Sequence, residues 1–360
     1  MIINFDAPFN STSIGQTSYN IYKELVKSNE VCIFPFGDKI DLDCFRGGET
    51  EKAELYKSSK FSEAFFSQKN PSLSIWHIRG SERSIGERKN LLTFHETDFL
   101  TPYEINRLSN LDKVFVSSKY TKEIFDFYLN GSTSVVHCPL GFDKESFRRI
   151  EKDENEEVIT FGIRGKLEKR KHSLRVIAAW AKTFGGDPRY RLDCSVYNPF
   201  YGNEQMEEFQ NAMPDKTVPW NVNVLPFLPT NELYNKALNQ ADIDLTGMSG
   251  CEGFNLPLFQ SLCLGKQAIV LNAHVHKDYC NSNNCILVEP SGKIDAVDGR
   301  FFLKDSIINQ GRWYDFKEKD LIEAMVFAAE KGRVRNTEGE KLQGWTFGIT
   351  AKILEKEITG

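Results

Sequence analysis

Short apolar runs alternate along this chain with segments of helical periodicity, and they do so in two separate series. The first series comprises MIINFDA, EVCIFPF, SLSIWHI, KNLLTFH, KVFVSS and SVVHCPL. The second series comprises VITFGIRG, RLDCSVYN, NVNVLPFL, DIDLTGM, QAIVLNA and CILVEP. Between the runs, segments such as TSYNIYKELVKS repeat apolar residues at helical spacing. Strands that alternate with helices form parallel, doubly wound sheets, so we predict an α/β fold with two such sheets.

The two series are separated by a charged stretch, RRIEKDENEEV, at residues 148–158. This stretch is too polar for a core and suits a linker, and 360 residues exceed the size at which one core usually stops growing. We predict domains at 1–150 and 151–335 and a C-terminal helix within 336–360. Since ligands of open parallel sheets bind beyond the carboxyl ends of the strands, two such domains predict a cleft between them.

Charge and cysteine content limit the binding partners and the cellular compartment that we expect for the chain. The 45 basic and 50 acidic residues give a net charge of -5, which disfavours nucleic acid as a partner but leaves local basic patches open. Apolar runs stay short of the ~18 residues of a membrane span, and the N-terminal residues lack the pattern of a signal peptide. Eight scattered cysteines fit a reducing compartment. We expect a cytoplasmic protein without a membrane span.

The segment SGCEGFNLPLFQSLCLGKQAIV, at residues 249–270, has the features of an anion-binding turn. Pro257 suits the first position of a helix and Gly265 suits its C-terminal cap, so a short helix is predicted between them. The unpaired amides at its start attract negative charge. Glu252 lies just before them, and its carboxylate competes with a bound phosphate unless it contacts an uncharged part of the same ligand. A phosphorylated polyol fits this arrangement.

Several segments together resemble one family of enzymes. The stretch NELYNKALNQADIDLTGMSGCEGFNLPLFQSLCLGKQAIV resembles the signature of retaining GT-B nucleotide-sugar glycosyltransferases, the group 1 glycosyl transferases related to sucrose and glycogen synthases, in their bacterial-type branch. TFHETDFLTPYEINRLSNLDKVFVSSKYTKEIF and PLGFDKESF resemble the family's N-terminal motifs, and RGKLEKRKHSL resembles its phosphate loop. The resemblance implies a GT-B architecture, in which two Rossmann-like domains face a central cleft. It also implies a nucleotide sugar as co-substrate, which we expect to be a UDP- or GDP-sugar, and no other cofactor.

The resemblance assigns roles to the turn and the helix that follows it. Glu252 would hold the sugar, and the backbone at Gly253 and its neighbours would face the distal phosphate and the sugar; these neighbours are Phe254, Asn255 and Leu256. Asn255 replaces the family's usual glycine, and Gln260 replaces a second glutamate that binds ribose. Because a neutral hydrogen bond contributes ~0.5–1.5 kcal/mol and a charged one ~1.5–3 kcal/mol, Gln260 predicts weaker or altered nucleotide binding.

A basic loop would balance the charge of the departing diphosphate. By resemblance, Lys166 stands where the family has arginine and Lys171 where it has lysine, while Arg164 and Arg170 are substitutes if the register shifts. One well-placed donor can contribute ~10²–10³ in rate. The alternative is a solvated loop whose charges contact only water.

Two residues of the N-terminal half are further candidates for the site. His95 ends a strand-like run, and in the resembling family a histidine or an acid near here contacts the transferred sugar, so His95 and Glu96 are both candidates. The alternative is a histidine that is hydrogen-bonded within its loop. Gly15, between the first strand and helix, would let the backbone approach the donor phosphate or the acceptor.

We predict no metal site. Asp242 and Asp244 would lie at the start of a strand, away from the ligand end. Asp41 and Asp43 lie in a polar connection and are not accompanied by a second motif that could complete a metal site. The stretch HVHKDYC, followed by NNC, contains histidines and cysteines, but their spacing does not match a zinc site.

The predicted activity is transfer of a sugar from a nucleoside diphosphate sugar to an acceptor hydroxyl. The resemblance implies retention of configuration, with the departing phosphate helping to deprotonate the acceptor and no obligatory protein nucleophile. The acceptor stays open between a glycan, a lipid-linked glycan, a protein and a modified nucleobase, and we expect its binding loops around residues 37–70. The alternatives are an epimerase or phosphorylase of the same fold, a degenerate nucleotide-sugar-binding protein, and an enzyme that glycosylates modified DNA bases.

Overall fold

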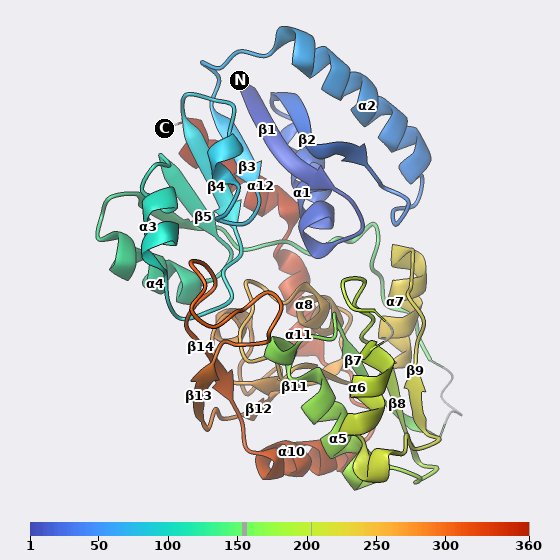
Figure 1. Ribbon diagram of the computed structural model, residues 1–360. Helices are drawn as coiled ribbons and strands as arrows, with labels where there is room; N and C mark the ends of the chain where they lie inside the picture. The colour runs from blue at the N-terminus through green and yellow to red at the C-terminus, as the bar shows by residue number, and fades with distance from the viewer. Residues whose placement is uncertain (153–156, 203, 360) are drawn as a thin grey trace.

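The computed structural model describes residues 1–152, 157–202 and 204–359, and these residues contain two parallel six-stranded sheets. The two sheets lie in separate domains, one above the other in Figure 1. Part of the predicted linker, residues 153–156, lies outside the described residues. No helix of the described residues is both long enough and apolar enough to cross a membrane.

The N-terminal sheet has the strand order β2-β1-β3-β4-β5-β6, in which all neighbours are parallel. Its strands are β1 (Ile2–Phe9), β2 (Glu30–Ile40), β3 (Ser72–Ile75), β4 (Lys89–Thr93), β5 (Lys113–Val116) and β6 (Ser134–His137). Its helices are α1 (Ser13–Leu25), α2 (Gly48–Phe65), α3 (Pro102–Leu108) and α4 (Lys119–Leu129). Each apolar run of the first series therefore contains a strand, as predicted.

The C-terminal sheet has the order β12-β11-β10-β7-β8-β9 and is also parallel throughout. Its strands are β7 (Ile159–Arg164), β8 (Tyr190–Ser195), β9 (Val222–Val224), β10 (Ile243–Gly247), β11 (Gln267–Leu271) and β12 (Ile286–Val288). The helices of this half are α5 (Ser173–Phe184), α6 (Glu204–Ala212), α7 (Asn231–Gln240), α8 (Leu256–Cys263), α9 (His276–Tyr279), α10 (Glu318–Lys331) and α11 (Thr337–Glu340). The second series of predicted strands is thereby confirmed.

Two elements differ from the predictions or add to them. Residues 48–65, where acceptor-binding loops were expected, form helix α2, which lies along the outer edge of the N-terminal domain in Figure 1. Few of its side chains are buried, so its helical pattern is weak in the sequence.

An antiparallel hairpin of β13 (Gly292–Asp295) and β14 (Arg312–Asp315) was not predicted. It contacts the N-terminal domain, because Asp98 accepts hydrogen bonds from Lys293 Nζ and the Arg312 amide, both at 2.8 Å.

The final helix, α12 (Phe347–Thr359), returns to the N-terminal domain and packs beside α1. Thr350 Oγ1 donates to the Pro139 carbonyl at 2.8 Å, and Lys113 forms an ion pair with Glu357 at 3.0 Å. In Figure 1 this C-terminal helix lies among the N-terminal strands and helices. The chain thus crosses between the domains twice.

Helix α8 lies where the two domains join. One hydrophobic cluster contains Phe5 and Leu73 from the N-terminal sheet together with Leu258 and Phe259 from α8. As predicted, α8 has a proline in its first turn and is followed by Gly265 in the left-handed conformation, with φ +75°. Packing against both domains fixes α8 and the loop that leads into it.

Candidate functional site

The loop between β10 and α8 packs against the N-terminal domain. A Cβ atom on Gly253 would lie 2.8 Å from Phe94 Cβ, so only glycine allows the two domains to approach this closely here. The Gly253 carbonyl accepts a hydrogen bond from Ser117 Oγ at 2.7 Å. These contacts hold the turn that carries Glu252 at the domain boundary.

Asn255 starts α8 in a conformation that glycine would adopt more readily. Its φ of +66° lies in the left-handed region, which asparagine tolerates better than most residues. Its Nδ2 lies 3.0 Å from His276 Nε2 and 3.3 Å from the Thr246 carbonyl, so the side chain braces the turn from within. Burial lowers the pKa of His276 to about 4, which keeps its Nε2 free to accept this hydrogen bond. Asn255 therefore fits the position that the family fills with glycine.

Five charged residues meet beside this turn. Arg170 belongs to a short 3-10 helix (Lys169–Lys171) after β7, and its two terminal nitrogens contact three carboxylates. One nitrogen, Nη1, lies 2.8 Å from Glu252 Oε2; the other, Nη2, lies 2.7 Å from Glu168 Oε2 and 3.0 Å from Glu96 Oε1. Lys171 forms an ion pair with the second oxygen of Glu252. We call Glu96, Glu168, Arg170, Lys171 and Glu252 the Arg170 cluster.

The two candidate carboxylates of the cluster differ in their protonation. Burial works to raise the pKa of Glu252, but the charges of Arg170 and Lys171 outweigh it and hold that pKa well below its usual range. Burial raises the pKa of Glu96 to about 7 against the attraction of Arg170, and the negative charges of Glu252 and Glu168 add to the rise. Glu252 is therefore ionised at neutral pH, whereas Glu96 titrates near it.

The other basic candidates lie in different surroundings. Lys166 is half-buried, and its Nζ lies 4.8 Å from the centre of the Phe200 ring rather than on Glu252. Burial lowers the pKa of Lys166. Arg164 is buried within the sheet, where it donates to the carbonyls of Asp193 at 2.6 Å and Ala237 at 2.8 Å. The structure therefore brings Arg170 and Lys171 to Glu252 and directs Arg164 into the core.

The N-terminal candidates are also separated by the fold. His95 Nε2 lies 3.0 Å from both the Phe99 carbonyl and Thr97 Oγ1, and burial lowers the pKa of this ring. His95 is thus hydrogen-bonded within its own loop, while the next residue, Glu96, contacts Arg170. Gly15 lies in the first turn of α1, where a Cβ atom would come within 2.4 Å of Asn10 Oδ1.

The remaining positions of the motif are buried around the turn. Gln260 lies on α8 one turn beyond its start and is buried. Phe254 is also buried, while Leu256 is partly exposed, and both pack in the cluster that spans the two domains. Their side chains thus support the turn, and their amides lie at the start of α8.

Among the described residues, no three histidine, cysteine or acidic side chains are grouped so that they could hold a metal ion. Asp242 contacts Lys152 at 3.0 Å and accepts from the Thr160 amide at 2.8 Å, at the amino end of the sheet. His274 Nε2 lies 2.9 Å from the Ser249 carbonyl, and His276 Nδ1 lies 3.0 Å from a backbone carbonyl of β11.

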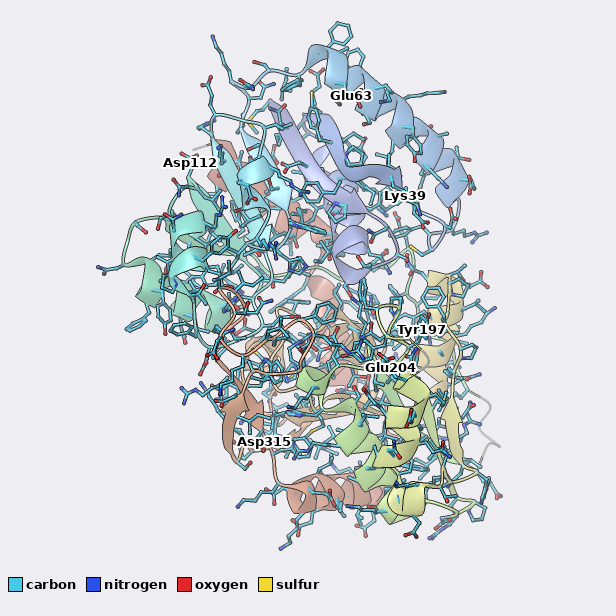
Figure 2. All side chains as sticks on the ribbon, viewed as in Figure 1. Lys39, Glu63, Asp112, Tyr197, Glu204 and Asp315 are labelled. Carbon is cyan, nitrogen blue, oxygen red and sulfur yellow. The ribbon has the colours of Figure 1, made fainter. Side chains whose placement is uncertain are left out.

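Sequence reasoning missed three aromatic residues near the site. Trp313, on the unpredicted hairpin, donates from Nε1 to the Glu96 carbonyl at 3.1 Å and so holds the peptide that presents Glu96. Tyr197 and Phe227 are exposed just after β8 and β9, with ring centres 5.7 Å apart. Figure 2 shows Tyr197 at the edge of the C-terminal domain nearest the N-terminal domain. For Tyr197 and Phe227, the signal available in the sequence was an aromatic residue just beyond the carboxyl ends of the strands that became β8 and β9.

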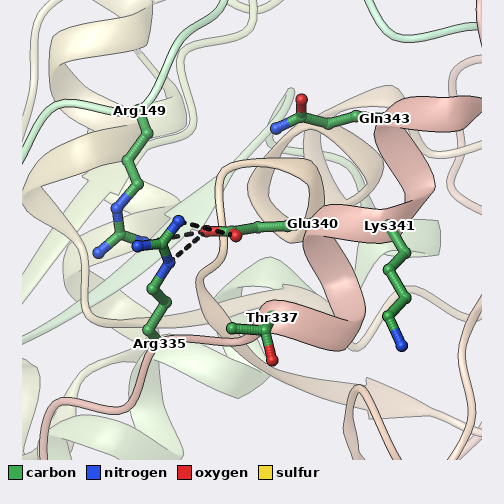
Figure 3. A pocket seen from close by; sticks show the side chains of 6 residues that line it. All are labelled: Arg149, Arg335, Thr337, Glu340, Lys341 and Gln343. Carbon is green, nitrogen blue, oxygen red and sulfur yellow. Dashed lines mark hydrogen bonds and ion pairs between the residues drawn. The ribbon is translucent and has the colours of Figure 1, made fainter.

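A separate hollow lies at the crossings between the domains and contains no residue of the Arg170 cluster. Figure 3 shows Arg149 and Arg335 converging on Glu340, while Lys341 points away from them. The hollow is open to solvent, has a volume of about 440 Å³ and is lined by Arg149, Arg335, Thr337, Glu340, Lys341 and Gln343.

Solved structures of known proteins share the two-domain fold of this chain. Anabaena HepE in complex with UDP-glucose is 13% identical, with a TM-score of 0.67 over 100% of this chain and 99% of that one. Sucrose-phosphate synthase from Thermosynechococcus elongatus is 12% identical, with a TM-score of 0.62 over 99% and 98% of the two chains. A glycosyltransferase from Rickettsia africae is also 12% identical, with a TM-score of 0.64 over 99% and 98%. The chain has the GT-B fold.

No family model matches the chain, and no curated protein matches it either. At 12–13% identity, the likeness to these structures establishes the fold rather than the activity. Within the GT-B fold, the Arg170 cluster lies where loops after β4, β7 and β10 meet at the domain boundary. Loops at the carboxyl ends of parallel strands are where open α/β sheets bind ligands.

Proposed function

We propose that this protein is a glycosyltransferase that moves a sugar from a nucleoside diphosphate sugar to an acceptor hydroxyl, with retention of configuration and without a metal. The observation that carries this proposal is the contact between Lys171 and Glu252 at the start of α8. A cation from the loop after β7 thus meets a carboxylate beside the amides at the start of α8, and a nucleotide sugar offers a matching phosphate and hydroxyls.

The residues of the turn and of the basic loop have distinct tasks in this proposal. Glu252 accepts hydrogen bonds from sugar hydroxyls, since its low pKa keeps it ionised. Lys171 and Lys166 bind the diphosphate and stabilise the charge that develops as it departs. Amides at Gly253 and Asn255 donate to the same phosphate. The departing phosphate then takes the proton of the acceptor hydroxyl, so no protein nucleophile is needed.

The nucleotide would extend towards the exposed aromatic pair. Tyr197 and Phe227 present ring faces at the carboxyl ends of β8 and β9, and a base can stack on such faces. Gln260 would contact the ribose through its neutral amide. HepE is known in complexes with UDP and with UDP-glucose, which favours a UDP-sugar over a GDP-sugar as the donor for this chain.

The eight cysteines are all unpaired, and seven of them are buried. Thiols persist in a reducing compartment, which supports the proposal that the protein acts in the cytoplasm. The acceptor is left open between a glycan, a lipid-linked glycan, a protein and a modified nucleobase.

The test is thermal stabilisation by UDP-, GDP-, ADP- and dTDP-sugars in the presence of EDTA, because only a ligand of the native state raises the Tm. We expect a selective shift that Lys171→Ala abolishes and that Lys182→Ala, a change of an exposed lysine on α5, preserves. Glu252→Gln should lower turnover more than it lowers stability. If no donor shifts the Tm, or if a shift requires a divalent metal, the proposal fails.

A second candidate is a protein that binds nucleotide sugars without transferring them. Gln260 favours it, because a neutral amide replaces the acid that the resembling family uses at this buried position. Donor binding without either hydrolysis or transfer would support this candidate over the first.

A further inference from the structure

Two carboxylates from opposite domains share one guanidinium. Glu252, from the C-terminal domain, lies 2.8 Å from Nη1 of Arg170, and Glu96, from the N-terminal domain, lies 3.0 Å from Nη2. The guanidinium is planar and rigid, so the positions of the two carboxylates are set relative to each other. The Arg170 side chain is only 5% exposed, whereas that of Glu96 is 29% exposed. Glu96 therefore still faces solvent at the boundary.

The fold directs Glu96, rather than His95, to this place. His95 is held by Thr97 and Phe99 inside its loop. The indole of Trp313 holds the carbonyl of Glu96 at 3.1 Å, which fixes the peptide on the other side of the residue. The side chain of Glu96 is thereby aimed across the domain boundary at Arg170.

The carboxylates of the Arg170 cluster outnumber its cations. Three carboxylates contact Arg170 and Lys171, and Lys166, outside the cluster, adds a third cation whose charge acts on Glu168 and Glu96. In the proposed function Lys166 and Lys171 bind the diphosphate, which leaves Arg170 as the cation that faces Glu96 and Glu252. The pKa of Glu96 near 7 is consistent with this charge balance, since burial and the neighbouring Glu252 and Glu168 both disfavour its ionised form.

We propose that Glu96 and Glu252 together restrict the donor to one whose transferred sugar is uncharged, and that Arg170 is the positioning residue that holds them side by side towards that sugar. This inference rests on the proposed function, in which Glu252 contacts the sugar. Sugar hydroxyls donate to carboxylates, so a neutral hexose satisfies both groups. A uronate would bring a further carboxylate against like charges, and such contacts weaken binding.

The experiment compares kcat/KM for UDP-glucose and UDP-glucuronate, measured as donor hydrolysis and as transfer. GDP-mannose and GDP-mannuronate replace them if the thermal panel selects guanine. We expect the neutral donor to be preferred by at least about tenfold, in line with the cost of placing like charges together. Glu96→Gln should reduce this ratio by raising uronate turnover, and Glu96→Asp should retain it.

Glu168→Gln is the matched control, because it removes an equal charge from the same guanidinium without changing the N-terminal domain. Arg170→Lys should change the ratio as well, since an ammonium cannot hold both carboxylates in one plane. The ratio of two kcat/KM values does not depend on the concentration of folded enzyme, so a folding defect alone cannot alter it.

Equal turnover of the two donors overturns the inference but leaves the proposed function standing. If Glu168→Gln lowers the preference for the neutral donor as much as Glu96→Gln does, the assignment to Glu96 is overturned. If the protein binds neither donor of either pair, the proposed function fails and the inference fails with it.

Discussion

Two clusters of arginine and glutamate lie where the domains of this protein meet, and their compositions are opposite. In one, the single guanidinium of Arg170 contacts the carboxylates of Glu96, Glu168 and Glu252. In the other, the single carboxylate of Glu340 contacts two arginines, Arg149 at 3.4 Å and Arg335 at 2.9 Å (Figure 3). Ion pairing alone therefore does not distinguish a binding site from a structural junction.

Burial and chain position do distinguish the two clusters. Arg170 is almost fully buried between loops at the carboxyl ends of strands, whereas the Arg335 side chain is 55% exposed beside the interdomain crossings. Removing one partner of a buried ion pair leaves a charge without compensation, while an exposed pair is screened by water. The comparison predicts large effects at Arg170 and small effects at Glu340.

The largest expected effect is on stability, from Arg170→Gln. The change leaves three carboxylates without their guanidinium, and breaking a buried pair costs about 3–5 kcal/mol. We expect the free energy of unfolding to fall by this amount in urea denaturation. Arg335→Gln is the matched change at the Glu340 cluster, where the arginine side chain is 55% exposed, and it should cost less than about 1 kcal/mol. Equal losses at the two arginines would remove the distinction.

Next in size is the effect of Lys171→Ala on turnover. Lys171 is expected to stabilise the departing diphosphate, so its loss should reduce kcat by about 10²–10³. Lys341→Ala, at the hollow of Figure 3, serves as the control and should leave kcat unchanged. Steady-state kinetics with the donor selected by thermal stabilisation provides the measurement. Unchanged turnover in Lys171→Ala would exclude this lysine from the reaction.

A smaller effect is expected in the pH dependence of stability. The pKa of Glu96 in the folded protein is about 7, above its ordinary value of 4.5, so the folded state binds a proton that the unfolded chain has released. The contribution of Glu96 to stability is therefore fully present below pH 4.5 and is lost as the pH rises to about 7. We expect Glu96→Gln to gain in Tm relative to the wild type across this window. A constant difference in Tm would contradict the raised pKa.

The smallest effect is expected from Glu340→Gln. Its partners are partly exposed, and exposed pairs contribute about 0.2–1 kcal/mol each. The loss should shrink as salt is added, because ions screen such pairs, whereas the loss caused by Arg170→Gln should depend little on salt. Urea denaturation at low and high ionic strength checks both statements. A large, salt-independent loss at Glu340 would show that this cluster also behaves as a buried one.

Much of the fold was predictable from local pattern. The apolar runs identified each strand of both parallel sheets, because a buried strand shows its burial in its own residues. The pattern failed for α2, whose side chains are mostly exposed, and for the hairpin of β13 and β14. Most side chains of α2 and of the hairpin are exposed or partly exposed, although Trp313 is buried, so periodicity carries little information about these elements.

The candidate site was marked more clearly by the sequence on its C-terminal side than on its N-terminal side, where His95 and Glu96 were both left open. The turn at Glu252 and the loop at Lys171 are marked by local chemistry, namely a glycine-bearing turn before a proline-started helix and a run of cations. For Arg164 and Arg170, the sequence offered two equivalent substitutes. The tertiary structure separates them by directing the first into the sheet and the second to Glu252.

By itself, the sequence determined two α/β halves, the helix that starts after Glu252 and the basic loop that faces it, because these features depend on neighbours a few residues apart. Only the tertiary structure decided that the last helix returns to the N-terminal domain and that Glu96, rather than His95, contacts Arg170. These contacts join residues far apart in the chain. They arise from the way whole domains pack, which no local pattern of residues encodes.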